Sequence, residues 1–279
     1  MKQVVDDQKK DNKKGIDDEI TIRLSYDITS PWSYLALAVL KRYKSIWNFD
    51  LVLNPIWLGG VVSLAKSVPP FKIPNKCKLM AEELPLMAMF FGVEYHPIKT
   101  FPVNTLKVMR LLRVIRIYKP EKLDACTDRL FKATFVDKIS PGDFDIIVKA
   151  LSSNQASSSF SNVRPSKSEK AVIFNESELK NLMAKAESDE NKVGLKEDTE
   201  KLVNQEFCFG FPWIQVFVRN RNSNSGDKDN EEQVRKLSIF GSDRFEFLAN
   251  WLGKKWYGPN PQIEPLFSET SNKIHESKL

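Results

Sequence analysis

The stretch Ile20-Thr21-Ile22-Arg23-Leu24-Ser25-Tyr26-Asp27-Ile28-Thr29-Ser30-Pro31-Trp32-Ser33-Tyr34-Leu35 decides the fold. Its short apolar segment, Ile20 to Tyr26, predicts a strand that runs directly into a helix through Ser-Pro-Trp-Ser. Ser30 followed by Pro31 is typical of a helix N-cap with proline at the first helical position. The backbone N–H groups and the dipole of the same helix start would also stabilise an anion such as a thiolate. The residues alone leave both interpretations open.

The chemistry of this corner is set by the absence of cysteine. In thioredoxin-like oxidoreductases the corner carries Cys-x-x-Cys, whereas serine occupies both positions here, so the corner cannot exchange disulfides. A hydroxyl there can instead activate the sulfur of another molecule. Lowering a thiol pKa from about 8.5 by roughly two takes about 2.7 kcal/mol, which one charge-assisted hydrogen bond and a helix start can supply.

Two distant segments belong to the same kind of site. The first, Phe209-Gly210-Phe211-Pro212-Trp213-Ile214, is a loop that ends in proline before an apolar run, Ile214 to Val218. A proline at this place in thioredoxin-like folds is cis and faces the corner, although an ordinary proline at a strand start fits the residues equally well. The second is Ile239-Phe240-Gly241-Ser242-Asp243-Arg244-Phe245-Glu246-Phe247-Leu248, where Ser242 or Asp243 could simply cap the last helix.

Together these segments resemble the kappa class of glutathione transferases, a branch of the thioredoxin-like, DsbA-related superfamily. The resemblance covers about residues 20–262. It is carried by the corner and by four further phrases: Arg42-Tyr43-Lys44-Ser45-Ile46-Trp47-Asn48, Phe209-Gly210-Phe211-Pro212, Phe240-Gly241-Ser242-Asp243-Arg244 and Leu252-Gly253-Lys254-Lys255-Trp256-Tyr257-Gly258-Pro259. It implies a homodimer that takes glutathione as co-substrate and directs its thiolate to an electrophile or a peroxide.

The resemblance also assigns roles to single residues. It implies that the Ser30 hydroxyl stabilises the glutathione thiolate and that Ser242 and Asp243 hold the γ-glutamyl end. It implies that Arg244 reaches glutathione across the dimer interface. The main chain of Phe211, before a cis Pro212, would pair with the cysteinyl backbone. Lys76 falls near the glycyl carboxylate, in a loop where Ser67 or Val68 replaces an asparagine of the family.

Two alternatives remain beside the transferase. The segments Ser33-Tyr34-Leu35-Ala36 and Pro55-Ile56-Trp57-Leu58-Gly59-Gly60-Val61-Val62 also resemble glutathione-dependent 2-hydroxychromene-2-carboxylate isomerases. A shared fold alone cannot decide between these activities. The Gly-Ser-Asp-Arg run and the Lys-Trp-Tyr-Gly-Pro ending are what favour the transferase. The second alternative is a noncatalytic carrier of glutathione or lipid.

The helical periodicity predicts an α/β protein, with an all-helical domain inserted into a discontinuous thioredoxin-like domain. The thioredoxin-like part spans 20–75 and 206–262, and the helical insert spans 76–205. Expected helices of the insert are 79–92, 105–118, 121–136, 143–151, 176–187 and 196–206. Two polar stretches, 152–169 and 220–232, are predicted surface loops, and a charged leader, 1–19, and a tail, 263–279, flank the fold.

The composition fits a globular enzyme, since 42% of the 279 residues are hydrophobic. No apolar run is long enough to cross a bilayer. The three cysteines, Cys77, Cys126 and Cys208, have no metal or redox spacing and are predicted to be reduced, and with only two histidines we expect no metal. The net charge is +6, but lysines alternate with acidic residues, so we predict no nucleic-acid partner.

One helix face carries a denser group of cations. Lys107, Arg110, Arg113 and Arg116 recur every three residues opposite apolar positions, so the pattern predicts an amphipathic helix with a solvated face, the alternatives being an acidic ligand or a subunit contact.

The residues Ser277-Lys278-Leu279 form a peroxisomal address when exposed at a C-terminus. We therefore expect recognition by the peroxisomal import receptor and a location in the peroxisomal matrix, with the mitochondrion or cytoplasm as alternatives. The acidic residues of the leader argue against a mitochondrial presequence.

Overall fold

The computed structural model describes residues 19–99, 101–152, 172–219 and 234–261. The predictions for the leader 1–18, for almost all of both polar stretches and for the tail with Ser277-Lys278-Leu279 lie outside the described residues. Within the described ranges, no helix combines the length and the apolar character needed to cross a membrane.

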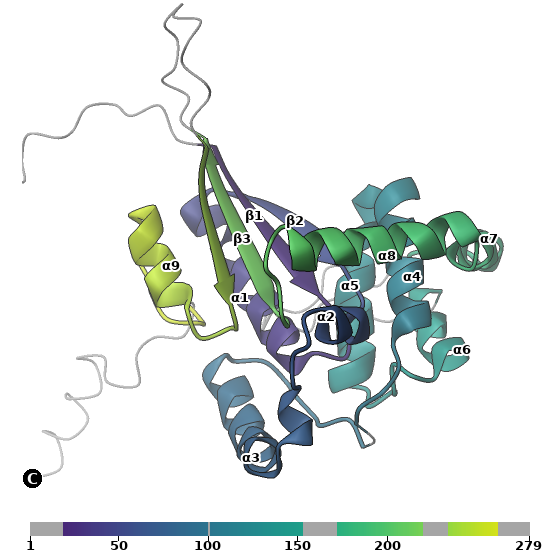
Figure 1. Cartoon of the computed structure of the whole chain (residues 1–279), viewed down its shortest axis with the longest axis horizontal. Coiled ribbons are helices and arrows are strands. Elements are labelled where there is room, and N and C mark those ends of the chain that lie inside the picture. The colour runs from purple at the N-terminus through teal and green to yellow at the C-terminus, as the bar shows by residue number, and fades with distance from the viewer. Residues whose placement is uncertain (1–18, 100, 153–171, 220–233, 262–279) are drawn as a thin grey trace, which may run out of the picture.

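A four-stranded sheet organises the fold, with strand order β2-β1-β3-β4 (Figure 1). The central strand β1 (Glu19–Tyr26) pairs parallel with β2 (Asp50–Pro55) and antiparallel with β3 (Trp213–Arg219). The edge strand β4 (Val234–Phe240) pairs antiparallel with β3. The DsbA-like α/β arrangement predicted from the sequence is therefore confirmed.

Helices surround this sheet and fill the interval between β2 and β3. The helix α1 (Pro31–Trp47) follows β1 and is buried continuously from Ser33 to Leu40, as expected for a helix enclosed on several sides. The remaining helical elements are α2 (Leu58–Leu64), η2 (Pro70–Lys72), α3 (Pro74–Phe90), α4 (Leu106–Tyr118), α5 (Pro120–Phe135), α6 (Phe144–Ile147), η3 (Val148–Leu151), α7 (Glu176–Ala186), α8 (Asp189–Asn204) and α9 (Phe245–Leu252). In Figure 1, α8 runs from α7 toward the sheet, whereas α3 stands apart.

The three arginines of the cationic face of α4 are half-buried in internal ion pairs, so the prediction of a solvated face is wrong for them, whereas Lys107 is exposed. Arg113 Nε and Arg116 Nη2 donate to the same oxygen, Asp198 Oδ2 on α8, at 2.9 and 2.6 Å. Gly194 leaves room for the guanidinium, because a Cβ at that position would overlap Arg113 Nη2. Arg113 and Arg116 therefore join α4 to α8.

Two of the distant sequence phrases pack against each other on the outer side of α1. The rings of Tyr43 and Trp256 stack with centroids 4.8 Å apart, and the Tyr43 hydroxyl donates to Gly258 O at 2.7 Å. Trp47 Nε1 donates to Lys255 O at 3.0 Å. The segment after α9 is thus strapped across α1 by aromatic contacts and backbone hydrogen bonds.

The structure differs from the expected helices in several places. The helix α8 begins at Asp189, not at Lys196, because Ser188 caps it by accepting from Asn191 N at 3.3 Å. The short helix α2 was not predicted. The last helix begins at Phe245, and neither Ser242 nor Asp243 caps it.

Candidate functional site

Four loops meet at one end of the sheet because of the strand register. Ser25 near the end of β1 lies opposite Trp213 at the start of β3, and Trp213 lies opposite Phe240 at the end of β4. The parallel strand β2 ends beside β1, where Ile56 N donates to Tyr26 O at 3.0 Å. The corner before α1, the proline loop, the turn after β4 and the start of α2 therefore share this end.

Ser30 is both the N-cap of α1 and a hydrogen-bond donor that is still available. Its backbone is extended (φ −89°, ψ 108°), and its hydroxyl oxygen accepts from Ser33 N at 3.2 Å. This contact uses a lone pair of the oxygen, not its proton. Among the described residues, no recorded hydrogen bond gives that proton an acceptor. The side chain is 4% exposed, so an anion at the helix start would meet this donor away from bulk water.

The proline loop has the expected cis geometry. The peptide bond between Phe211 and Pro212 is cis, and both residues are buried. The carbonyl oxygen of Pro212 accepts from Gly241 N at 3.1 Å, which ties this loop to the turn after β4. The ring of Phe209 fixes the same junction by packing on Phe240, with ring centroids 4.7 Å apart.

Ser242, Asp243 and Arg244 occupy the turn between β4 and α9. Ser242 is buried, and its hydroxyl has no partner among the described residues. A buried polar group without a partner is costly, so this hydroxyl is a candidate contact for a ligand. Asp243 and Arg244 are exposed, and Arg244 Nη1 donates to Asp243 Oδ1 at 2.9 Å and to Phe240 O.

Lys76 lies on α3, outside the four loops that the strand register brings to this end of the sheet. It is exposed in the first turn of α3. No recorded hydrogen bond or ion pair of the described residues connects it with the corner, the proline loop or the turn after β4. The strand register therefore brings together Ser30, Phe211, Pro212 and Ser242, with Asp243 and Arg244 beside them, and not Lys76.

Asp27 belongs to this end of the sheet and was not selected from the sequence. Its carboxylate is fully buried and accepts from Thr29 N, Leu58 N and the Thr105 hydroxyl. Burial raises the pKa of Asp27 to about 6, against the lowering effect of these hydrogen bonds. The sequence signal was an acidic residue at the end of a buried strand, where a carboxylate needs several donors.

The cysteines supply no reactive thiol at the corner. All three are free; Cys126 and Cys208 are buried, and burial raises the pKa of each to about 12. Their thiols therefore stay protonated at neutral pH. Cys77 is exposed on α3. In the described part of the chain, no group of three or more His, Cys, Asp or Glu side chains could hold a metal ion.

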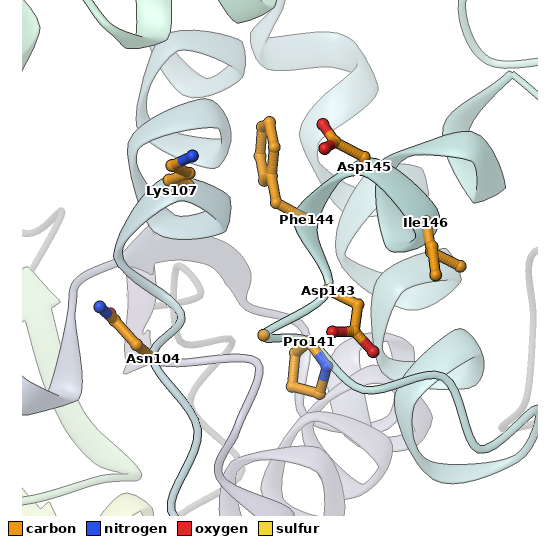
Figure 2. A pocket seen from close by; sticks show the side chains of 8 residues that line it. Asn104, Lys107, Pro141, Asp143, Phe144, Asp145 and Ile146 are labelled. Carbon is orange, nitrogen blue, oxygen red and sulfur yellow. The ribbon is translucent and has the colours of Figure 1, made fainter.

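A cavity of about 460 Å³ lies in the helical insert, between the start of α4 and the segment 141–146 (Figure 2). Asn104 and Lys107 line one side, and Asp143, Phe144 and Asp145 line the other. No predicted site residue lines it. Its connection to the corner is indirect: Thr105, which follows Asn104, donates a hydrogen bond from its hydroxyl to Asp27 Oδ2 at 2.9 Å.

Comparisons with known proteins agree with this arrangement. Residues 21–253 match the family model of the DSBA-like thioredoxin domain. Glutathione S-transferase kappa 1 of Homo sapiens is 29% identical over 246 residues, covering 86% of this chain and 94% of its own. Glutathione S-transferase kappa 2 of Caenorhabditis elegans is 22% identical over 250 residues, covering 88% and 96%.

Solved structures show the same fold. A 2-hydroxychromene-2-carboxylate isomerase superposes with a TM-score of 0.57 at 18% identity, covering 84% of this chain and 94% of the isomerase. A probable DsbA oxidoreductase of Streptomyces coelicolor has a TM-score of 0.57 at 14% identity, covering 90% and 94%.

The buried carboxylate of Asp27 predicts a pH dependence of stability. Because its pKa is about 6 in the folded protein and near 3.8 when unfolded, the folded state binds the proton more tightly between these values. The unfolding free energy should therefore fall as pH rises from about 4 to above 6, by roughly 2 to 3 kcal/mol from this group. Urea unfolding of wild type and Asp27→Asn at several pH values measures this as a change in their stability difference. A difference that stays constant would contradict the raised pKa.

Proposed function

The chain belongs to the DSBA-like thioredoxin domain family, and we propose that within it the protein is a glutathione transferase of the kappa type. It binds glutathione at the corner before α1, lowers the pKa of the glutathione thiol and directs the thiolate to an electrophile or a peroxide. The observation that carries this proposal is the buried Ser30 hydroxyl, which caps α1 through its oxygen and keeps its proton for an incoming anion.

The other loops provide the contacts that hold the tripeptide. The backbone of Phe211, before the cis Pro212, would pair with the cysteinyl backbone, as an added strand does at a sheet edge. The orphan hydroxyl of Ser242 and the exposed carboxylate of Asp243 suit the γ-glutamyl carboxylate and ammonium groups. Lys76, exposed in the first turn of α3, remains the proposed contact of the glycyl carboxylate.

The rate enhancement would come from two sources. Thiolate stabilisation raises the concentration of the nucleophile at neutral pH, and binding next to the acceptor converts a bimolecular attack into an intramolecular one. Ser30 acts as an electrostatic stabiliser and forms no covalent bond. The isomerase alternative would use the same thiolate and shares the fold, whereas the named sequence relatives are transferases, which favours conjugation.

Replacing Ser30 tests the catalytic assignment. Ser30→Ala should leave glutathione affinity within a few fold and lower the conjugation rate by roughly ten to a thousand fold, because one anion-stabilising donor is removed. Ultraviolet thiolate absorbance of bound glutathione, titrated with pH, should show the thiol pKa returning toward its free value.

Ser188→Ala is the matched control, since Ser188 caps α8 in the same way. Both variants lose a cap worth about 1 kcal/mol, but only Ser30→Ala should change the thiolate signal. An unchanged conjugation rate in Ser30→Ala would contradict the assignment, and tight binding by wild type without any thiolate would favour the carrier alternative.

We also propose that the protein forms a homodimer through the outer side of α3. This helix packs mainly against η2 and stands apart in Figure 1. It exposes four large apolar side chains, Leu79, Leu86, Met89 and Phe90, at 60 to 77%. Such a set on one helix is unusual for a free surface and suits the same helix of a second copy. Arg244, exposed at the turn after β4, would then reach the site of the partner subunit.

Charges on this helix should dissociate the dimer. Leu86→Glu with Met89→Asp would place four carboxylates in a two-fold interface, so sedimentation velocity should show the monomer mass and the KM for glutathione should rise. Val193→Glu, at an exposed apolar position of α8, serves as the control that keeps the dimer mass. A wild-type protein that sediments as a monomer at micromolar concentration would refute this interface.

The peroxisomal location is a separate proposal that rests on Ser277-Lys278-Leu279 alone. A fluorescent protein fused before Met1 should enter peroxisomes with the full chain and remain outside them when these three residues are deleted. The same distribution for both fusions would argue against the import signal.

A further inference from the structure

One side chain joins three separate segments beside the corner. Asp27 Oδ1 accepts from Thr29 N at 3.0 Å, while Oδ2 accepts from Leu58 N at 2.8 Å and from the Thr105 hydroxyl at 2.9 Å. The donors belong to the turn before α1, the start of α2 and the segment of the insert before α4. A single carboxylate thus connects the corner with both neighbouring parts of the structure.

The ionised carboxylate is an acceptor at both oxygens and so serves all three donors. An asparagine of the same shape has one acceptor oxygen and an NH₂ group, so it would turn a donor toward one of the backbone N–H groups. No recorded ion pair of the described residues neutralises Asp27, whose carboxylate is entirely buried. The charge therefore reduces stability, as the pH dependence above describes, and a benefit other than stability is needed to explain it.

The charge also acts against the function proposed for the corner. Asp27 lies three residues before Ser30, and the turn between them is closed by Ser30 N donating to Asp27 O at 3.0 Å. A buried negative charge near a thiolate raises the thiol pKa by repulsion. Electrostatics alone would thus make Asp27 unfavourable for a thiolate site, whereas its geometry fixes the turn that presents the Ser30 hydroxyl.

We propose that Asp27 is a positioning residue of the thiolate site, which holds the Thr29 backbone so that the Ser30 hydroxyl and the N–H groups of α1 face the sulfur. Through Leu58 N and the Thr105 hydroxyl it also fastens α2 and the helical insert to this turn. This inference rests on the proposed function, because the positioned groups are those assigned to the glutathione thiolate.

The two ways in which Asp27 could act predict opposite signs. In Asp27→Asn, loss of repulsion alone would lower the pKa of the bound glutathione thiol, whereas loss of positioning should raise it and leave about tenfold less thiolate at neutral pH. Thr105→Val keeps the charge and removes one donor, so it should shift the thiol pKa in the same direction by a smaller amount. Thr105→Ser restores the hydroxyl and should restore the signal.

The experiment titrates bound glutathione by thiolate absorbance and follows amide hydrogen exchange in the same variants. Tyr26→Phe is the matched control. Tyr26 directly precedes Asp27, and the substitution removes its buried hydrogen bond to the Thr127 hydroxyl, at 2.6 Å, without touching the contacts of Asp27. In Asp27→Asn and Thr105→Val, the amide hydrogens of the peptides that contain Thr29 and Leu58 should exchange faster. Tyr26→Phe should change neither the exchange of these peptides nor the thiolate signal.

The outcomes separate this inference from the proposed function. A wild-type thiolate signal that is unchanged or strengthened in both Asp27→Asn and Thr105→Val would overturn the role of Asp27 and leave the transferase proposal intact. A wild-type protein that binds glutathione without forming thiolate would contradict the proposed function and this inference with it. A raised thiol pKa in both variants, with rescue by Thr105→Ser, supports the positioning role.

Discussion

The register of β1 is the constraint on which the site depends. Because β1 pairs parallel with β2 and antiparallel with β3, the end of β1, the end of β2 and the start of β3 coincide, and the pairing of β3 with β4 adds the turn after Phe240. A slip of one residue would turn Ile22 and Leu24 away from the core and the half-buried Arg23 into it, so burial fixes the register strongly. The convergence of four loops therefore follows from the same hydrophobic pattern that forms the core.

The chemistry of the site follows from a hydroxyl that stands where a disulfide exchanger needs sulfur. A serine N-cap satisfies one backbone N–H of α1 and still offers its own proton, so helix capping and the proposed anion binding use different atoms of the same group. The two buried thiols, Cys126 and Cys208, are kept protonated by burial, and Cys208 Sγ donates to Gly210 O of the proline loop at 3.4 Å. At the corner before α1, a cysteine sulfur would allow disulfide exchange, whereas the serine oxygen found here allows only the proposed stabilisation of another molecule's thiolate.

The sequence predicted the sheet, the corner and the proline loop because these depend on local patterns. An apolar segment followed by Ser-Pro identifies a strand and a helix start without knowledge of what packs on them. The role of the arginines on α4 could not be predicted, since Asp198 and Gly194 lie some eighty residues later in the chain and only packing brings them together. The role of Asp27 could not be predicted for the same reason, because its donors Leu58 N and the Thr105 hydroxyl are distant in sequence.

The strap across α1 has a consequence for the order in which the protein is completed during synthesis. The helix is made early, yet Trp47 and Tyr43 find their partners at Lys255 and Gly258, 208 and 215 positions later. Until that segment leaves the ribosome, Tyr43 and Trp47 lack the ring of Trp256 and the backbone acceptors that contact them in the folded chain. The helix that begins at the corner is therefore among the first elements translated and among the last to be fully enclosed.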